Sequence, residues 1–144
     1  MYLAFIIRNF LNYFNLNYQA IRFELQEMIN IYYTPINERL PQEKLDKYLN
    51  QLPDFIRSEI IRYRRWQDVQ RSLYGKLLLK KAIESIESPK LSLTDLKYST
   101  FNKPYFDNAF DFNISHSGDY AVCAFSTVCK VGIDIEEIRP IDFM

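Results

Sequence analysis

Two acidic residues late in the sequence have the spacing of a metal-binding pair. Asp134 and Glu136 alternate with Ile133 and Ile135, and side chains two residues apart in a strand project from the same face. Two neighbouring carboxylates suit Mg²⁺, which proteins usually hold with one or two carboxylates, water and substrate phosphates. The alternative is an amphipathic edge strand whose polar face is exposed to water and binds no metal. The two acids alone do not decide between these interpretations.

The single histidine, His116, lies in a segment with the composition of an anion-binding corner. Ser115 and Ser117 flank it, and Gly118 allows the backbone to turn sharply. Hydroxyl groups, free backbone N–H groups and one imidazole together suit a phosphate. The alternative is a hydrogen-bonded surface histidine that takes no part in chemistry.

Two cations, Arg71 and Lys103, are further candidates for binding a phosphate. Arg71 falls on an expected helix with Gly75 one turn later, where a neighbouring backbone or ligand can approach closely, and Lys103 precedes a turn at Pro104. Gly75–Lys76 is not a phosphate loop, because the earlier glycine and the following hydroxyl residue of that motif are missing. The alternatives are a solvated charged helix face and an exposed turn lysine.

Length and composition indicate one compact domain or part of a larger one. The chain has 144 residues, of which 48% are hydrophobic and 25% charged, so a packed core is expected. Zero formal net charge argues against sequence-independent nucleic-acid binding. The longest apolar run of the early segment, 2–7, is too short to cross a membrane. Two cysteines without a secretory signal predict a reduced, cytoplasmic protein.

Charge is unevenly distributed along the chain. The charged residues of segment 57–81 are mostly basic, whereas those of segment 134–142 are mostly acidic. A basic helical surface near an acidic strand suits a polyanion held partly by cations and partly by a metal.

The apolar pattern predicts an α+β fold of mixed helices and a small antiparallel sheet. Strands are expected at 29–34, 97–100, 110–115, 120–126 and 131–138, with 127–129 as a hairpin connection that lacks glycine. Helices are expected from Pro41 to Asn50 and from Pro53 onwards, the second with a kink or break at 63–67 and an end at Ser88–Pro89.

The order of four sequence blocks resembles the 4′-phosphopantetheinyl transferases of the Sfp type. The blocks are Arg71–Ser72 followed by Gly75, then Asn102–Lys103–Pro104, then F-N-I-S-H-S-G at 112–118, then V-G-I-D-I-E at 131–136. The similarity runs from about Met28 to the end. Such enzymes move the phosphopantetheine arm of coenzyme A onto a serine of an acyl or peptidyl carrier protein, with catalysis by positioning and charge neutralisation.

The resemblance implies roles for individual residues. Asp134 and Glu136 are the expected Mg²⁺ ligands, and together with His116 they are the expected catalytic residues. Arg71, Lys103, Ser115 and His116 are the expected contacts to coenzyme A, chiefly to its phosphates. One departure concerns Ile56 and Glu59, which stand where the family often carries lysines.

The family fold consists of two similar halves, and the resemblance covers only the N-terminal one. Residues 28–144 are expected to form that half, and 1–27, which resemble nothing in the family, to be an extension outside the fold. The blocks of the second half, including its base and a further metal-binding glutamate, are missing. We therefore expect activity only with a second copy or a separate C-terminal fragment. The alternatives are a non-catalytic coenzyme A-binding fragment and a protein-interaction module.

Overall fold

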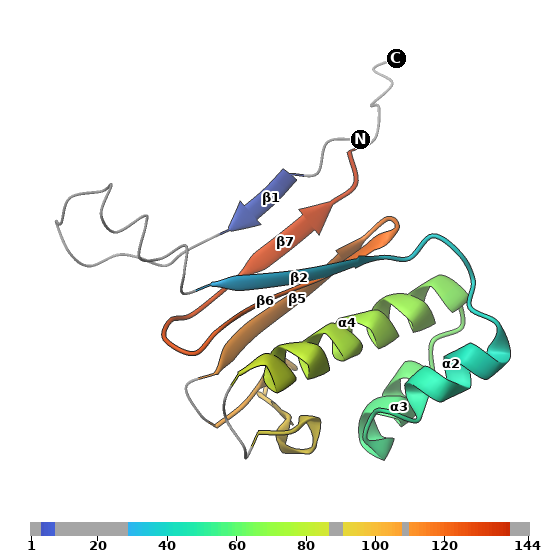
Figure 1. Cartoon of the computed structure of the whole chain (residues 1–144), viewed down its shortest axis with the longest axis horizontal. Coiled ribbons are helices and arrows are strands. Elements are labelled where there is room, and N and C mark those ends of the chain that lie inside the picture. Colours follow the sequence, from blue (N-terminus) through green and yellow to red (C-terminus); the bar gives the residue numbers. More distant parts are fainter. Residues whose placement is uncertain (1–3, 8–28, 87–90, 108–109, 139–144) are drawn as a thin grey trace, which may run out of the picture.

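The computed structural model describes residues 29–86, 91–107 and 110–138, together with the backbone of residues 4–7. These residues form helices packed against a small antiparallel sheet, which confirms the predicted α+β class. Figure 1 shows the helices on one side of the main sheet and a further pair of strands on the other.

The main sheet has the strand order β2–β6–β5 and is antiparallel throughout. Strand β2 (Asn30–Pro35) and strand β5 (Asp111–Ser117) flank the central strand β6 (Tyr120–Ser126). A two-residue turn joins β5 to β6, and Gly118 adopts a φ of +53° there, a conformation that glycine reaches without steric cost. Strand β5 continues two residues beyond the predicted end at Ser115, so His116 belongs to the strand.

Three helices lie on one side of this sheet in the described part of the chain, with α4 packed on the sheet and α2 and α3 packed on α4. Helix α2 (Gln42–Leu49) follows Pro41 as predicted, and helix α3 (Asp54–Ile60) follows Pro53. The predicted interruption is a complete break, after which helix α4 (Trp66–Ser85) begins. Its predicted end at Ser88–Pro89 lies outside the described residues. A short 3₁₀ turn (Leu93–Asp95) leads into a small hairpin of β3 (Lys97–Tyr98) and β4 (Pro104–Tyr105), so the strand expected at 97–100 is shorter than predicted.

Apolar residues are buried on both faces of the sheet. On the helical face, Leu73 and Leu79 of α4 belong to the same core as Phe125 of β6, which also stacks on Phe110. On the opposite face, Val122 of β6 forms a second core with residues of strand β7 (Ile133–Glu136). Central strand β6 is therefore buried on both sides, as its nearly continuous apolar sequence requires.

The predicted hairpin between 120–126 and 131–138 is wrong in its pairing. Among the described strands, β7 forms no backbone ladder with the main sheet but lies over its second face, next to β5. The backbone of β7 pairs instead with β1 (Ala4–Ile7), in antiparallel direction, with Ile6 opposite Asp134. The other residues of the segment 1–27 lie outside the described part, and the expectation that this segment stands outside the fold stays a prediction.

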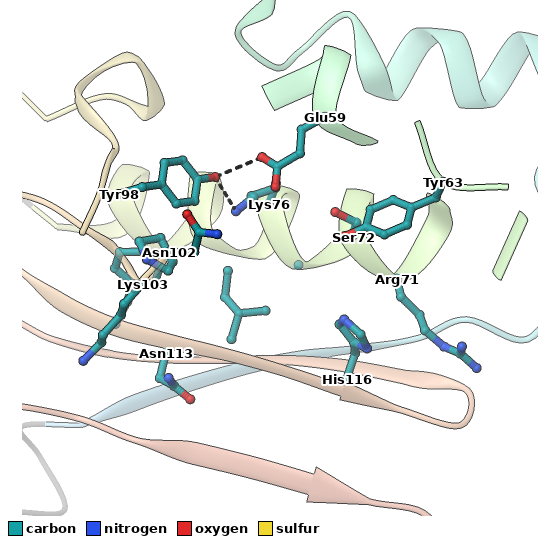
Figure 2. Close-up of a pocket in the computed structure, with 14 residues that line it drawn as sticks. Glu59, Tyr63, Arg71, Ser72, Lys76, Tyr98, Asn102, Lys103, Asn113 and His116 are labelled. Atoms are coloured by element: carbon teal, nitrogen blue, oxygen red, sulfur yellow. Dashed lines mark hydrogen bonds between the residues drawn. The ribbon is translucent and has the colours of Figure 1, made fainter. Parts of the chain in front are cut away.

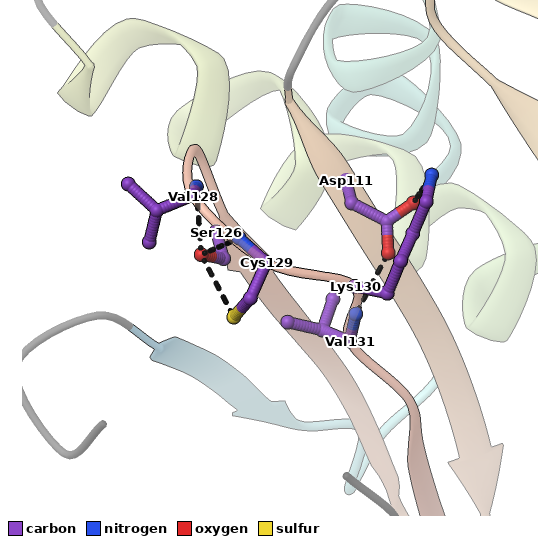
Figure 3. A network of polar contacts seen from close by, with 6 residues as sticks. All are labelled: Asp111, Ser126, Val128, Cys129, Lys130 and Val131. Carbon is purple, nitrogen blue, oxygen red and sulfur yellow. Dashed lines mark hydrogen bonds and ion pairs between the residues drawn. The ribbon is translucent and has the colours of Figure 1, made fainter. Parts of the chain in front are cut away.

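Two side chains hold the connection from β6 to β7, whose first residues, 127–129, include no glycine (Figure 3). The buried hydroxyl of Ser126 accepts hydrogen bonds from the backbone N–H groups of Val128 and Cys129, each at 3.2 Å. The Asp111 carboxylate accepts one from the Val131 N–H at 2.7 Å. Because serine and aspartate side chains can replace backbone partners in tight turns, the chain turns out of the sheet at 127–129 without a glycine there.

Candidate functional site

A pocket of about 380 Å³ lies between helix α4, strand β5 and the β3–β4 hairpin. Three of the residues selected from the sequence, Arg71, Lys103 and His116, line it from different elements (Figure 2). Tertiary folding thus collects two cations and an imidazole around one cavity. The remaining lining residues are Glu59, Tyr63, Ser72, Gly75, Lys76, Tyr98, Asn102, Pro104, Phe112, Asn113 and Ile114.

Arg71 connects helix α4 to the turn between β5 and β6. Its Nε and Nη2 atoms donate to the Gly118 carbonyl at 3.1 and 2.9 Å, and its Nη1 lies 3.2 Å from the Asp68 carboxylate. A guanidinium has five N–H donors in a planar fork, and these contacts occupy three of them. The other two N–H groups make no hydrogen bond to the residues that the structure describes.

His116 and Ser115 point to opposite faces of β5, because neighbouring strand residues alternate. The exposed His116 imidazole faces α4 and the pocket (Figure 2), and it makes no hydrogen bond to the residues that the structure describes. Ser115 is not among the pocket residues and instead contacts β7. The structure therefore separates two adjacent residues that the sequence had placed together.

Lys103 stands at the end of the tight loop that joins β3 to β4. Ser99 closes this loop, since its N–H donates to the Lys103 carbonyl at 2.9 Å and its hydroxyl accepts from the Lys103 N–H at 3.1 Å. Asn102 adopts a φ of +57°, which asparagine tolerates better than most residues. The loop backbone is fixed, while the Lys103 side chain is exposed at the pocket.

A polar chain of three side chains on the pocket wall was not found from the sequence. Lys76 Nζ donates to the Tyr98 hydroxyl at 3.3 Å, and that hydroxyl donates to Glu59 Oε2 at 3.2 Å (Figure 2). Burial lowers the pKa of Lys76, and the negative charge of Glu59 opposes that shift. Burial, followed by the charge and hydrogen bond of Glu59, raises the pKa of Tyr98 to about 12.

The sequence gives little sign of this chain of side chains. Lys76 and Tyr98 are 22 residues apart, and Tyr98 and Glu59 are 39 apart, so no helical or strand period links them. Lys76 on α4 and Glu59 on α3 are joined through the hydroxyl of Tyr98, which the β3–β4 hairpin supplies.

The acidic pair lies on β7 in the arrangement that the sequence predicts. Asp134 and Glu136 are exposed, whereas Ile133 and Ile135 are buried against the sheet. Both carboxylates therefore face away from the second core, on one side of the strand. This alternation is confirmed; the metal-binding role of the pair remains a prediction.

Side chains of β5 hold β7 in register through a regular ladder. Each acceptor on β5 receives a hydrogen bond from the backbone N–H of the residue 20 positions later, at 2.7 to 3.2 Å. Backbone pairing between β5 and β7 is thus replaced by hydrogen bonds from the β7 backbone to β5 side chains. The rungs are Asp111 to Val131, Asn113 to Ile133, Ser115 to Ile135 and Ser117 to Glu137.

The donor set on β7 fits part of a Mg²⁺ site. Two carboxylates on one strand face match the hard oxygen ligands that this ion prefers. Among the described residues, no third histidine, cysteine or acidic side chain joins them in a metal-binding group. The pair therefore fits a cation that takes its remaining ligands from water, a phosphate or another polypeptide.

Two further observations concern the cysteines and the helices of the described residues. Both cysteines are free thiols, as the sequence predicts, with Cys123 buried and Cys129 partly exposed. In the described part of the chain, no helix has the length and apolar character needed to cross a membrane.

Comparison with known proteins gives one consistent family. The family described as "4′-phosphopantetheinyl transferase, N-terminal" matches residues 40–128. That range includes Arg71, Lys103, Ser115 and His116 and ends before Asp134 and Glu136.

Individual relatives carry the same designation. The 4′-phosphopantetheinyl transferase Sfp of Bacillus subtilis (strain 168) is 32% identical over 117 residues, which are 78% of this chain and 51% of the relative. The transferase gsp of Aneurinibacillus migulanus is 42% identical over 83 residues, 57% of this chain and 34% of the relative. AcpT of Salmonella typhi is 40% identical over 80 residues, 53% of this chain and 38% of the relative.

The chain thus spans about half, or less, of the length of these relatives. Its matched segment nevertheless covers more than half of its own residues and carries the pocket described above. This chain belongs to the 4′-phosphopantetheinyl transferase family, and it corresponds to the family's N-terminal part.

Proposed function

We propose that this chain supplies the coenzyme A-binding half of an enzyme that transfers 4′-phosphopantetheine from coenzyme A to a serine of an acyl or peptidyl carrier protein. The observation that carries the proposal is the pocket in which Arg71, Lys103 and His116 converge, inside the segment that matches the family. Coenzyme A is rich in phosphate, and convergent cations and N–H donors are what a phosphate requires.

In this proposal the pocket holds the nucleotide end of coenzyme A. Arg71 offers its two remaining N–H groups to a phosphate, while its bonds to Gly118 fix the direction of the guanidinium. Lys103 adds a point charge from the rigid hairpin loop. His116 adds an N–H donor from the strand, which becomes charge-assisted when the imidazole is protonated.

The acidic pair on β7 would hold Mg²⁺ through Asp134 and Glu136. When bound, such an ion neutralises charge on the pyrophosphate of coenzyme A. The carrier serine would lose its hydroxyl proton to a base in the other part of the site, and its oxygen would bond to phosphorus as the anhydride bond to the leaving adenosine 3′,5′-bisphosphate breaks. The chain's own contribution to that step is to orient the phosphates between the pocket cations and β7.

Turnover in this proposal also uses a part of the site beyond the residues described, because the matched segment covers 51% of the Sfp relative. That part, with most of the carrier-protein surface, would come from a second copy, a separate C-terminal fragment or a further segment of the same polypeptide. We place the protein in the cytoplasm, where coenzyme A and free thiols such as Cys123 and Cys129 are both stable.

The test is an intact-mass assay with coenzyme A, Mg²⁺ and an apo carrier protein. The chain is supplied alone and mixed with the C-terminal half of a relative. We expect the carrier protein to gain one phosphopantetheine group in the mixture. Asp134→Asn and Glu136→Gln should abolish the gain, whereas Glu43→Gln, an exposed acid in the first turn of α2, should leave it unchanged.

The other outcomes identify the alternatives. If the mixture gives no mass gain but coenzyme A still raises the melting temperature of the chain, the chain is a coenzyme A-binding fragment without turnover. If coenzyme A neither reacts nor stabilises the chain, both the transfer and the nucleotide pocket are rejected, and a protein-interaction role remains.

A further inference from the structure

The hydroxyl of Ser115 bridges the backbone and the carboxylate of the acidic strand. Ser115 Oγ donates to Asp134 Oδ1 at 2.9 Å and accepts from the Ile135 N–H at 3.2 Å. The same Ile135 N–H is also shared with Asp134 Oδ1 at 3.0 Å. The three groups form a closed set of hydrogen bonds at the centre of β7.

These hydrogen bonds use the hydroxyl hydrogen of Ser115 and one carboxylate oxygen of Asp134. A serine hydroxyl has one hydrogen and two lone pairs, and the hydrogen of Ser115 is committed to Asp134. The side chain of Ser115 therefore has no hydrogen left to donate to a phosphate oxygen. On Asp134, Oδ1 receives two hydrogen bonds, whereas Oδ2 receives none from the described residues.

We propose that Ser115 is a positioning residue that orients the Asp134 carboxylate, so that Oδ2 is presented to the divalent cation. This differs from the role that the family resemblance implies, which is a direct contact to coenzyme A. The inference rests on the proposed function, since it takes Asp134 as a metal ligand. Partners in the outer shell of a metal site commonly fix ligand orientation, and their loss weakens metal binding about 10–100-fold.

The side-chain ladder supplies a matched control. Ser117 forms an equivalent rung, because its hydroxyl accepts from the Glu137 N–H at 3.2 Å. Among the described rungs, only that of Ser115 also reaches a carboxylate on β7. Ser115→Ala and Ser117→Ala therefore each remove one hydrogen bond from a backbone N–H group. Only Ser115→Ala also removes the hydrogen bond to the Asp134 carboxylate.

The experiment measures Mn²⁺ binding to the full chain by electron paramagnetic resonance, with saturating coenzyme A. We expect Ser115→Ala to weaken Mn²⁺ binding about tenfold, and Ser117→Ala to change it less than about twofold. Ser115→Thr keeps the hydroxyl on a strand-compatible side chain and should restore wild-type affinity. A second titration without metal should give the same coenzyme A dissociation constant for Ser115→Ala and the wild type.

Each remaining outcome counts against a defined part of the inference. Equal Mn²⁺ affinity in Ser115→Ala and the wild type overturns the positioning role. Weaker coenzyme A binding by Ser115→Ala, with or without Mn²⁺, also overturns it and favours the direct contact. A wild-type chain that binds coenzyme A but no Mn²⁺ rejects the metal site of the proposed function itself. Circular dichroism melts of both alanine variants keep a folding defect from being read as a loss of metal binding.

Discussion

Gly75 on helix α4 lies directly against Ile114 on strand β5, at the floor of the pocket. A Cβ atom built at Gly75 would lie 2.9 Å from Ile114 Cγ2, closer than two carbon atoms can pack. The Ile114 methyl branches from a stiff β-branched side chain, so it cannot simply rotate away. Gly75 thus sets how closely α4, which carries Arg71, approaches β5, which carries His116.

We therefore expect Gly75→Ala to destabilise the protein, although alanine is the better helix former. The helical preference favours alanine by about 1 kcal/mol, whereas overpacking a tight contact costs about 1–3 kcal/mol. Urea denaturation should give a net loss of about 1 kcal/mol in the free energy of unfolding. In a double-mutant cycle with Ile114→Ala, the double variant should lose less than the sum of the two single losses. Additive losses would contradict the contact.

Arg71→Lys should destabilise the protein even though the charge is kept. Lysine cannot reproduce the two parallel bonds to the Gly118 carbonyl, and hydrogen bonds that involve charged groups contribute about 1.5–3 kcal/mol. We expect a loss of about 2 kcal/mol in urea denaturation. The control is Arg64→Lys, at an exposed position, where the change should stay within about 0.5 kcal/mol. Equal effects at both positions would contradict the role of Arg71 as a link between α4 and the β5–β6 turn.

Tyr98→Phe should change how stability depends on alkaline pH. The pKa of Tyr98 is about 12 in the folded protein and about 10 in the unfolded chain. The phenol therefore keeps its proton to a higher pH in the folded state. The stability that this phenol contributes is complete below pH 10 and is lost as pH rises towards 12. Unfolding free energies measured from pH 8 to pH 11 should fall less steeply in Tyr98→Phe above pH 10.

Lys76→Met should change the pH profile in the opposite direction. Because burial lowers the pKa of Lys76 in the folded state, the unfolded state binds more protons just below the ordinary lysine pKa. Stability therefore rises with pH in that window, and Lys76→Met should remove the rise in the same denaturation series. Parallel profiles for wild type, Tyr98→Phe and Lys76→Met would contradict the environment described for both residues.

The two thiols should differ strongly in reactivity. Burial raises the pKa of Cys123 to about 12, with Lys76 nearby opposing the shift, so almost no thiolate forms at pH 8. Cys129 is partly exposed, and within the described part of the chain its thiol donates to Ser126 Oγ at 3.4 Å. Iodoacetamide followed by intact mass should show one rapid alkylation, which disappears in Cys129→Ser. Addition of urea should make Cys123 reactive, and rapid double alkylation without urea would contradict the burial of Cys123.

Local rules acting on neighbouring residues determined a large part of this fold. Prolines at 41 and 53 mark the starts of α2 and α3, and the polar residues around 63–67 mark the break before α4. The alternation of Asp134 and Glu136 with two isoleucines fixed which face of β7 is exposed. These features follow from backbone sterics and from periods of two or 3.6 residues, which act over a few positions. The family blocks could be recognised for a similar reason, since each is a short run of residues.

Tertiary structure alone decided how these pieces meet. The sequence suggested a hairpin of β6 and β7, but polar side chains on β5 pair with the β7 backbone and draw it across the sheet. Strand β5 extends past Ser115, so Ser115 and His116 diverge to β7 and to the pocket. Glu59, Lys76 and Tyr98 meet through packing of segments with no shared period. Such contacts depend on the burial of whole faces and on hydrogen bonds between distant residues, neither of which a local pattern encodes.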